Sequence, residues 1–166
     1  FVNQAGEIGE MQLGEGEYIH PGDSKFYNTL SPGMNHWRSH LPATYYCTHA
    51  LSPIMHVTDT MPIGVNALCI PYFDSDRERL YVKRGDIGSS ILCSMNNQSV
   101  VIINGLGLRG HGIWYRIHGT RGRMENLRHG GGGKLRITHE AWDMKEGDEP
   151  EKIYQPDFPV HADLAA

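Results

Sequence analysis

The sequence lacks a long apolar run, an excess of charge of either sign, and an even set of cysteines. None of its apolar segments reaches the roughly 20 residues that a membrane-spanning helix needs, and the N-terminus has no basic region followed by an apolar core. The formal net charge is −4 over 166 residues, which does not favour binding to nucleic acid or to a membrane surface. We therefore expect one globular domain whose partners are neither nucleic acids nor membranes.

The cysteines Cys47, Cys69 and Cys93 are far apart and contain no C-x-x-C pair. This pattern argues against a disulfide framework and favours a reducing compartment, so we expect a cytoplasmic location. Arginines do cluster between residues 109 and 128, but mostly at predicted strand ends and turns. A solvated face is the simpler interpretation of that cluster, and a phosphate or carboxylate site remains the alternative.

Twenty glycines fit a chain with many turns and strands. Turn signals and apolar alternation predict strands over residues 10–20, 63–73, 89–95, 99–104, 112–119, 121–127 and 134–141. Residues 24–43 are expected to be irregular. The predicted class is α+β, with an open-faced, mostly antiparallel sheet and one or two helices on one face, over residues 1–142. Residues 143–166 are expected to form an acidic, proline-containing tail.

The predicted helix covers about residues 45–58 and is closed by Asp59 and Pro62. Thr44 is its expected N-cap, because a threonine hydroxyl can accept a bond from a free first-turn N–H. Ala50, Ile54 and Val57 follow a spacing of four and then three, so they can form an apolar stripe on this helix.

Tyr45 and Tyr46 precede His49 by four and three residues, so both can share its face of the helix. A tyrosine–imidazole cluster beside an apolar stripe is expected of a helix that lines a substrate cleft. A buried histidine that is hydrogen-bonded to a tyrosine explains the pattern equally well.

Ten histidines raise the question of a metal site. His36 and His40 have the i, i+4 spacing of two ligands on a helix, and His49 and His56 could join them. However, prolines on both sides of this pair leave little room for a helix, and no carboxylate stands at the spacing of a further metal ligand. We predict no metal site.

Five short motifs carry a resemblance to a known family. They are Gly-Glu-Ile-Gly-Glu at 6–10, Gly-Glu-Tyr-Ile-His at 16–20, His-Trp-Arg at 36–38, Thr-His-Ala-Leu-Ser-Pro at 48–53 and Gly-Thr-Arg-Gly at 119–122. Their order resembles that in the C-terminal domain of the Gfo/Idh/MocA oxidoreductases. The resemblance implies an open-faced sheet that supplies substrate contacts and pairs subunits into a homo-oligomer.

The same resemblance implies a Rossmann domain that binds NAD or NADP. This sequence has no glycine-rich fingerprint of the Rossmann type, in which the glycines lead from a strand into a helix, and no Glu-Lys-Pro cofactor motif. The chain is therefore expected to be a fragment that lacks the Rossmann domain and is inactive alone. No residue is assigned to cofactor binding.

For the chemistry, the resemblance implies removal of hydride from a sugar or cyclitol, with His49 as the proton-transfer residue and Tyr46 or Tyr45 orienting it. Arg38 and Trp37 are expected to contact the substrate, as is Tyr18. Each has a structural alternative: Tyr18 as a strand-end aromatic, Arg38 in a salt bridge with an acid such as Glu17, and Trp37 as a core wedge.

One departure from the family bears on the reaction. Dehydrogenases of this family carry an aspartate four residues before the helix histidine, where this chain has Tyr45. The segment 46–53 is instead similar to the NAD-dependent alpha-N-acetylgalactosaminidase branch. An NAD-recycling glycosidase, with Tyr18 or Tyr46 as its second base, is thus an alternative, and a non-catalytic sugar-binding or assembly module is another.

Overall fold

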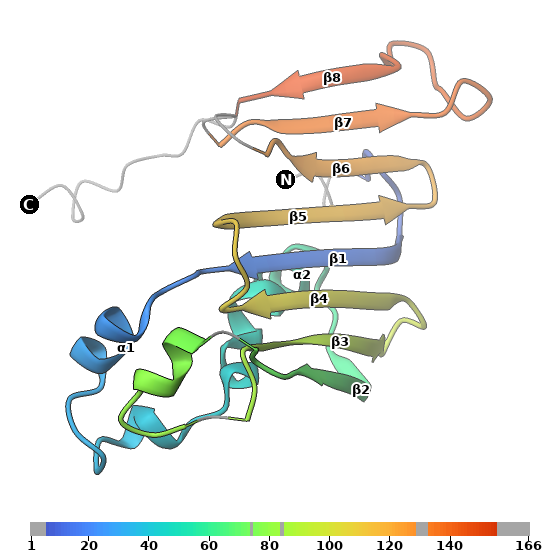
Figure 1. Cartoon of the computed structure of the whole chain (residues 1–166). Helices are drawn as coiled ribbons and strands as arrows, with labels where there is room; N and C mark the ends of the chain where they lie inside the picture. The colour runs from blue at the N-terminus through green and yellow to red at the C-terminus, as the bar shows by residue number, and fades with distance from the viewer. Residues whose placement is uncertain (1–5, 74, 84, 129–132, 156–166) are drawn as a thin grey trace, which may run out of the picture.

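One large sheet organises the structure, a computed structural model that describes residues 6–73, 75–83, 85–128 and 133–155 (Figure 1). The strands occur in the order β2-β3-β4-β1-β5-β6-β7-β8 across this sheet. Their bounds are β1 Met11–Ile19, β2 Pro62–Ile70, β3 Gly88–Met95, β4 Val100–Leu106, β5 Gly112–Gly119, β6 Gly122–Asn126, β7 Leu135–His139 and β8 Glu151–Tyr154. The helices are α1 Ser24–Leu30 and α2 Cys47–Thr58, with 3-10 helices η1 Trp37–His40, η2 Ala43–Tyr46 and η3 Ser75–Arg79.

The sheet is antiparallel except at its centre, where β1 pairs with β4 in parallel. The parallel pair arises because the chain leaves β1, forms α2, and returns through the β2–β3–β4 meander before β4 reaches β1. The architecture confirms the predicted α+β class with an open, mostly antiparallel sheet.

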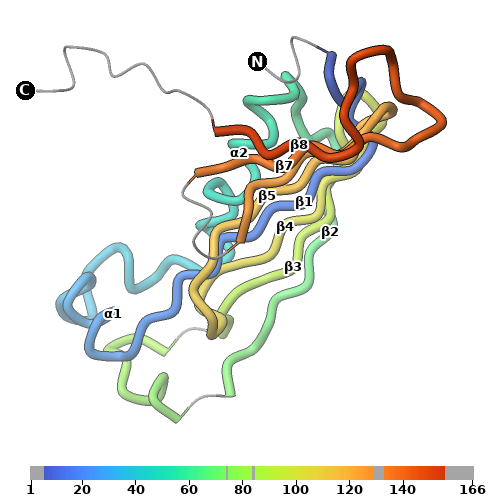
Figure 2. Tube along the Cα trace, turned by 90° about the horizontal axis from the view of Figure 1, so that it is seen from above, coloured from blue at the N-terminus to red at the C-terminus, as the bar shows by residue number. Residues whose placement is uncertain are grey.

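Helix α2 lies on one face of the sheet and packs against β1, β4 and β5 (Figure 2). Ala50 and Ile54 point into the core and are 2% and 1% exposed. Burial of a side chain such as Ile54 contributes about 1.5–3 kcal/mol. The third residue of the stripe, Val57, is 39% exposed, so the buried part of the stripe is Ala50 and Ile54. Val57 lies in the last turn of the helix, just before Asp59 ends it in a left-handed conformation (φ 53°).

Helix α2 approaches β1 closely because β1 presents glycines to it. An added Cβ at Gly16 would stand 2.3 Å from the carbonyl oxygen of Ala50, and one at Gly14 would stand 3.0 Å from Cγ2 of Ile54. Since side chains alternate along a strand, Tyr18 lies on this same face. The two glycines therefore set the distance between helix α2 and strand β1, and with it the position of the helix relative to Tyr18.

Two elements and one helix cap differ from the prediction. Helix α1 falls in the segment expected to be irregular, and it forms because the side chain of Asp23 accepts a hydrogen bond from the N–H of Phe26 (2.7 Å). Strand β8 falls in the expected tail, where it extends the edge of the sheet beside β7. Thr44 is not the N-cap of α2, because it lies within η2 and α2 begins three residues later.

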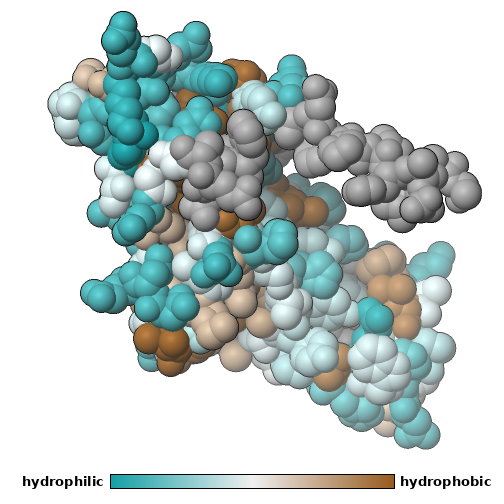
Figure 3. Space-filling view, turned by 180° about the vertical axis from the view of Figure 1, so that it is seen from behind, coloured by the Kyte–Doolittle hydropathy of each residue, from teal (hydrophilic) through white to brown (hydrophobic). Residues whose placement is uncertain are grey.

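No helix of the described residues covers the other face of the sheet, which carries cross-strand ion pairs. Arg116 contacts Glu15, and Arg128 bonds Glu17 at 3.2 Å. The arginines expected on a solvated face thus lie partly on the open sheet, paired with acids. On the opposite side, the α2 face, the apolar areas are small and scattered among hydrophilic ones (Figure 3).

All three cysteines are free thiols. Among the described helices, none is long and apolar enough to cross a membrane.

Candidate functional site

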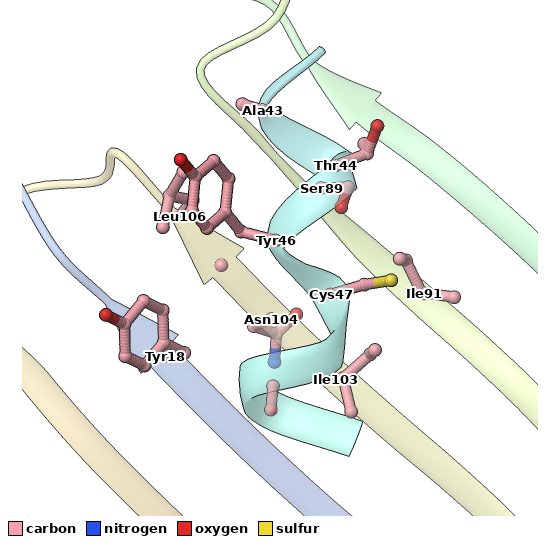
Figure 4. Close-up of a pocket in the computed structure, with 12 residues that line it drawn as sticks. Tyr18, Ala43, Thr44, Tyr46, Cys47, Ser89, Ile91, Ile103, Asn104 and Leu106 are labelled. Atoms are coloured by element: carbon pink, nitrogen blue, oxygen red, sulfur yellow. The ribbon is translucent and has the colours of Figure 1, made fainter. Parts of the chain in front are cut away.

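Three rings from β1, η2 and α2 meet at the carboxyl end of β1. The imidazole of His49 lies 4.5 Å from the Tyr18 ring and 5.6 Å from the Tyr46 ring, measured between ring centroids. Figure 4 shows Tyr18 and Tyr46 on the two elements that flank this corner. His49 itself is exposed, so the alternative of a buried structural histidine does not hold. The arrangement is an accessible imidazole with a phenol on each side.

Tyr46 is oriented by Arg38, whose guanidinium donates a hydrogen bond to the Tyr46 hydroxyl. The Arg38 guanidinium also lies over the ring of Trp37, 5.1 Å from its centroid. Trp37 is 60% exposed on η1, so it is not a wedge in the core. The acid proposed as an alternative partner of Arg38, Glu17, instead bonds Arg128.

Tyr45 lies apart from the imidazole. It is 61% exposed, and its ring contact is with Tyr46 at 6.4 Å between centroids. Residues 43–46 form a 3-10 helix and α2 begins only at Cys47, so Tyr45 and His49 do not lie on one continuous α-helical face. Tyr46, the last residue of η2, does bring its ring to His49.

The backbone of His49 is held by β5. Pro53 has no N–H to donate to the carbonyl of His49, four residues earlier in α2. The Tyr115 hydroxyl takes that place and donates to the His49 carbonyl oxygen at 2.6 Å. Burial, together with the neighbouring Tyr18, raises the pKa of Tyr115, so this phenol remains a protonated donor. Proline and tyrosine together fix the helix turn that carries the imidazole.

Asp86 anchors the start of the tyrosine-bearing segment. Its buried carboxylate accepts hydrogen bonds from the N–H groups of Ala43 and Thr44, both at 3.2 Å. These N–H groups at the start of a helical segment have no partner within it, which explains why an acid is placed there. Sequence analysis missed Asp86, since it lies more than 40 residues from its partners and outside any helix or strand.

A second aromatic group, also missed, continues from Tyr18 along the chain. His20 stacks against Tyr18 at 6.0 Å and also meets Phe26 at 6.0 Å and His111 at 5.3 Å. His20 directly follows β1 and His111 directly precedes β5, so the antiparallel pairing of these strands brings the two histidines together. If the sequence prediction had paired the strand before His20 with the strand after His111, it would have placed these two histidines together.

The space between Tyr18, Tyr46 and Leu106 is small. Its open volume is about 10 Å³, roughly that of a single water molecule. A sugar-sized molecule would therefore lie outside this gap, against the exposed side of His49. Within the described part of the chain no group of three or more His, Cys, Asp or Glu side chains is placed to hold a metal ion. One histidine weighed for a metal site, His40, instead contacts the carbonyl oxygen of Met34 at 2.8 Å.

Gly105, Gly107 and Gly110 have the G-x-G-x-x-G spacing of a dinucleotide turn, which sequence analysis did not note. Gly105 lies at the end of β4, and Gly107 and Gly110 lie in the connection to β5, so the three do not lead into a helix and lack the helix N-terminus on which a pyrophosphate is bound. This segment does not fit a nicotinamide dinucleotide.

No protein-family model matches the sequence, and no curated protein matches it significantly. Solved structures with the same fold include an oxidoreductase from Sinorhizobium meliloti (TM-score 0.65, 16% identity, 99% of this chain and 40% of that one). Another is an inositol dehydrogenase homolog from Azotobacter vinelandii in complex with NADH and myo-inositol (0.65, 14%, 98% and 40%). A third is the UDP-N-acetylglucosamine 3-dehydrogenase GnnA from Acidithiobacillus ferrooxidans (0.59, 16%, 99% and 45%).

At this identity the likeness establishes the fold alone. The chain spans less than half the length of each of these three oxidoreductase structures.

Proposed function

We propose that this chain is the substrate-binding domain of a Gfo/Idh/MocA-type oxidoreductase that acts on a sugar or cyclitol with NAD or NADP. The observation that carries the proposal is the exposed imidazole of His49, held between Tyr18 and Tyr46. The shared fold with the inositol dehydrogenase homolog and GnnA supports it.

In this proposal His49 accepts the proton of the substrate hydroxyl as that carbon is oxidised. An imidazole suits the role because it takes up and releases a proton near neutral pH. Tyr46, held by Arg38, orients the imidazole, and Tyr115 fixes the backbone beneath it. NAD or NADP would supply the hydride acceptor, held by a Rossmann domain outside this chain, because the described residues include no dinucleotide cradle.

The substrate contacts are proposed for Trp37, Arg38 and Tyr18. The exposed indole of Trp37 offers a flat apolar face to a sugar ring, and Arg38 offers a planar set of donors to hydroxyl groups. Tyr45 is a weaker candidate, since its side chain is 61% exposed and its ring contact is with Tyr46.

We also propose that the open sheet face pairs two copies of the protein. Apolar side chains stand on this face of β2 and β3, where Leu68 is 77% and Leu92 is 45% exposed. A paired subunit would remove them from water.

The test is a substrate panel. The protein at its full natural length is incubated with NAD or NADP and a set of sugars and cyclitols, and the reduced nicotinamide is followed by absorbance. Net reduction with at least one of them supports the proposal, and it fails if no member of the panel is oxidised or otherwise turned over.

A second candidate, the NAD-recycling glycosidase, is favoured by one contact. The Tyr18 ring lies 4.5 Å from the imidazole of His49, so a second base, the Tyr18 phenol, would stand beside the first base, the imidazole. This reaction would release an aglycone without net reduced nicotinamide, and the carbon next to the oxidised one would exchange its hydrogen for deuterium. The same panel, run in D₂O with glycosides, separates the two candidates.

A further inference from the structure

Two further imidazoles stand beside the site, at the end of the sheet where β1 leads to α1 and β5 begins (Figure 1). They belong to His20 and His111, called the histidine pair below, and their ring centroids lie 5.3 Å apart in an edge-to-face contact. The strands that carry them pair in register at Ile19 and Gly112. Strand pairing therefore holds the two rings together, and the proposed reaction uses neither of them.

The histidine pair continues a row of rings that begins at His49. The Tyr18 ring lies 4.5 Å from the His49 imidazole, and the His20 ring lies 6.0 Å from the Tyr18 ring. Tyr18 and His20 are two residues apart, and side chains alternate along an extended chain, so the two rings project from the same side of it. The row thus carries the site past Tyr18 by two imidazoles.

His20 is held in place from both sides. Its N–H donates to the carbonyl oxygen of Leu106 at 2.7 Å, and its own carbonyl oxygen accepts from the Tyr27 hydroxyl at 3.2 Å. Its ring is stacked against Tyr18 and against Phe26, each at 6.0 Å between centroids. The imidazole is therefore preorganised, which lowers the entropic cost of a contact with a ligand.

The ring nitrogens of the histidine pair are available to a ligand. Within the part of the chain that the structure describes, no group is hydrogen-bonded to any of them. His111 is exposed and His20 is half-buried, so these nitrogens can bond to water in the free protein. Phe26, which is 40% exposed, adds an apolar ring face beside them. Polar nitrogens and an apolar face thus lie together on an accessible surface.

This combination suits a neutral, hydroxyl-bearing ligand. A neutral imidazole has one nitrogen that donates and one that accepts, and a hydroxyl group can both accept and donate. A phosphate or carboxylate only accepts, so it would leave the acceptor nitrogens of both rings without a partner. The C–H face of a sugar ring can lie on the aromatic face while its hydroxyls reach the nitrogens.

We propose that the histidine pair binds the second ring of a two-ring carbohydrate, a disaccharide or a glycosylated cyclitol, whose first ring is oxidised at His49. The gap between Tyr18 and Tyr46 has an open volume of only about 10 Å³, so the first ring lies on its open side. The second ring then continues past Tyr18 to the pair. This inference rests on the proposed function, because it takes His49 as the place of the reacting ring.

The experiment is calorimetric titration of the full-length protein with reduced nicotinamide present, so that no sugar is oxidised. The one-ring probes are glucose, galactose and myo-inositol, and the two-ring probes are maltose, cellobiose and lactose. We expect at least one two-ring probe to bind at least tenfold more tightly than every one-ring probe. His20→Phe and His111→Phe should each lower this preference by about three- to tenfold, because the ring is kept and its hydrogen bonds are lost.

The matched control is His56→Phe, since His56 is exposed on α2 and makes no ring contact with described residues. It should keep the wild-type preference. A second readout needs no variant: a two-ring probe should shield His111 of the wild-type protein from diethyl pyrocarbonate, followed by peptide mass spectrometry, whereas a one-ring probe should not. Modification of His56 should be unchanged by either probe.

The outcomes separate this inference from the proposed function. It is overturned if wild type binds two-ring probes no more tightly than one-ring probes, or if both phenylalanine variants keep the preference. It is also overturned if the variants lose affinity for both classes alike, which would show a structural role of the rings. In these cases one-ring probes still bind to wild type and the proposed function stands. If no probe binds and none is oxidised, the proposed function fails and the inference fails with it.

Discussion

Replacement of Gly16 by alanine tests whether the close approach of α2 to β1 sets the geometry of the site. The added Cβ would stand 2.3 Å from the Ala50 carbonyl oxygen, whereas ordinary contacts begin at 3.4 Å. The neighbour is backbone and belongs to the residue next to His49, so no side chain can rotate away to relieve the clash. The helix must move outward by the difference, about 1 Å.

The consequences follow from that displacement. Overpacking of this kind costs about 1–3 kcal/mol of the free energy of unfolding. The displacement also separates His49 from Tyr18, which stays with the strand. A shift of about 1 Å in a catalytic group lowers turnover on the order of a hundredfold.

The assays are urea unfolding and turnover of the full-length protein on its best substrate. The control is Gly14→Ala, whose Cβ would stand 3.0 to 3.2 Å from side-chain atoms of Ile54, Val101 and Met11 and would meet no backbone atom among its three nearest neighbours. The shift it demands is a few tenths of an ångström, smaller than the shift of about 1 Å at Gly16, so turnover should change by less than about threefold. Equal stability and turnover of Gly16→Ala and Gly14→Ala would refute the reasoning.

Three further predictions concern the supports of the site and the open face. Asp86→Ala should lower the free energy of unfolding by about 1–3 kcal/mol in urea melts, because two N–H groups lose their acceptor. Tyr115→Phe should cost about 0.5–1.5 kcal/mol in the same assay and should lower turnover more than substrate affinity, since it frees the His49 carbonyl. Burial, with Arg116 nearby, lowers the pKa of His118, so the unfolded chain takes up the proton first as the pH falls. Stability should therefore decline from about pH 6.5 downward, and His118→Asn should lessen this decline between pH 7.5 and 5.5.

Each of these has an outcome that contradicts it. Wild-type stability in Asp86→Ala would show that its two hydrogen bonds are replaced by water at no cost. If Tyr115→Phe changed substrate affinity and left turnover unchanged, the Tyr115 hydroxyl would not be what positions His49. Identical pH dependence of the free energy of unfolding in wild type and His118→Asn would show that His118 does not cause the loss of stability at low pH.

The strands of the second half could be predicted because their signals are local. Residues 112–119 were predicted as a strand with the bounds that β5 has, and the strands predicted at 89–95 and 99–104 correspond to β3 and β4, which the turn at Asn96–Gln98 connects. Gln98 takes a positive φ of 69° in that turn. Short elements were not predicted: α1 has seven residues in a segment expected to be irregular, and β8 has four residues with no apolar alternation.

The site was predictable only in part, because several of its contacts depend on tertiary structure. The pairing of His49 with Tyr46 follows from spacing along the chain. The roles of Asp86 and Tyr115 do not, since the first reaches back over more than 40 residues and the second lies across the sheet. Tyr45 was grouped with His49 because the helix was taken as α throughout, whereas its first turn is a separate 3-10 helix.

The most direct test of the account is the effect of His49→Gln on turnover of the full-length protein. We expect reduction of NAD or NADP to fall by about 10²–10⁴-fold, while sugar binding, measured by calorimetry, stays within a few fold. The control is His56→Gln, because His56 is exposed on the same helix and makes no ring contact with described residues. The account predicts wild-type turnover for His56→Gln, and equal turnover of the two variants would contradict it.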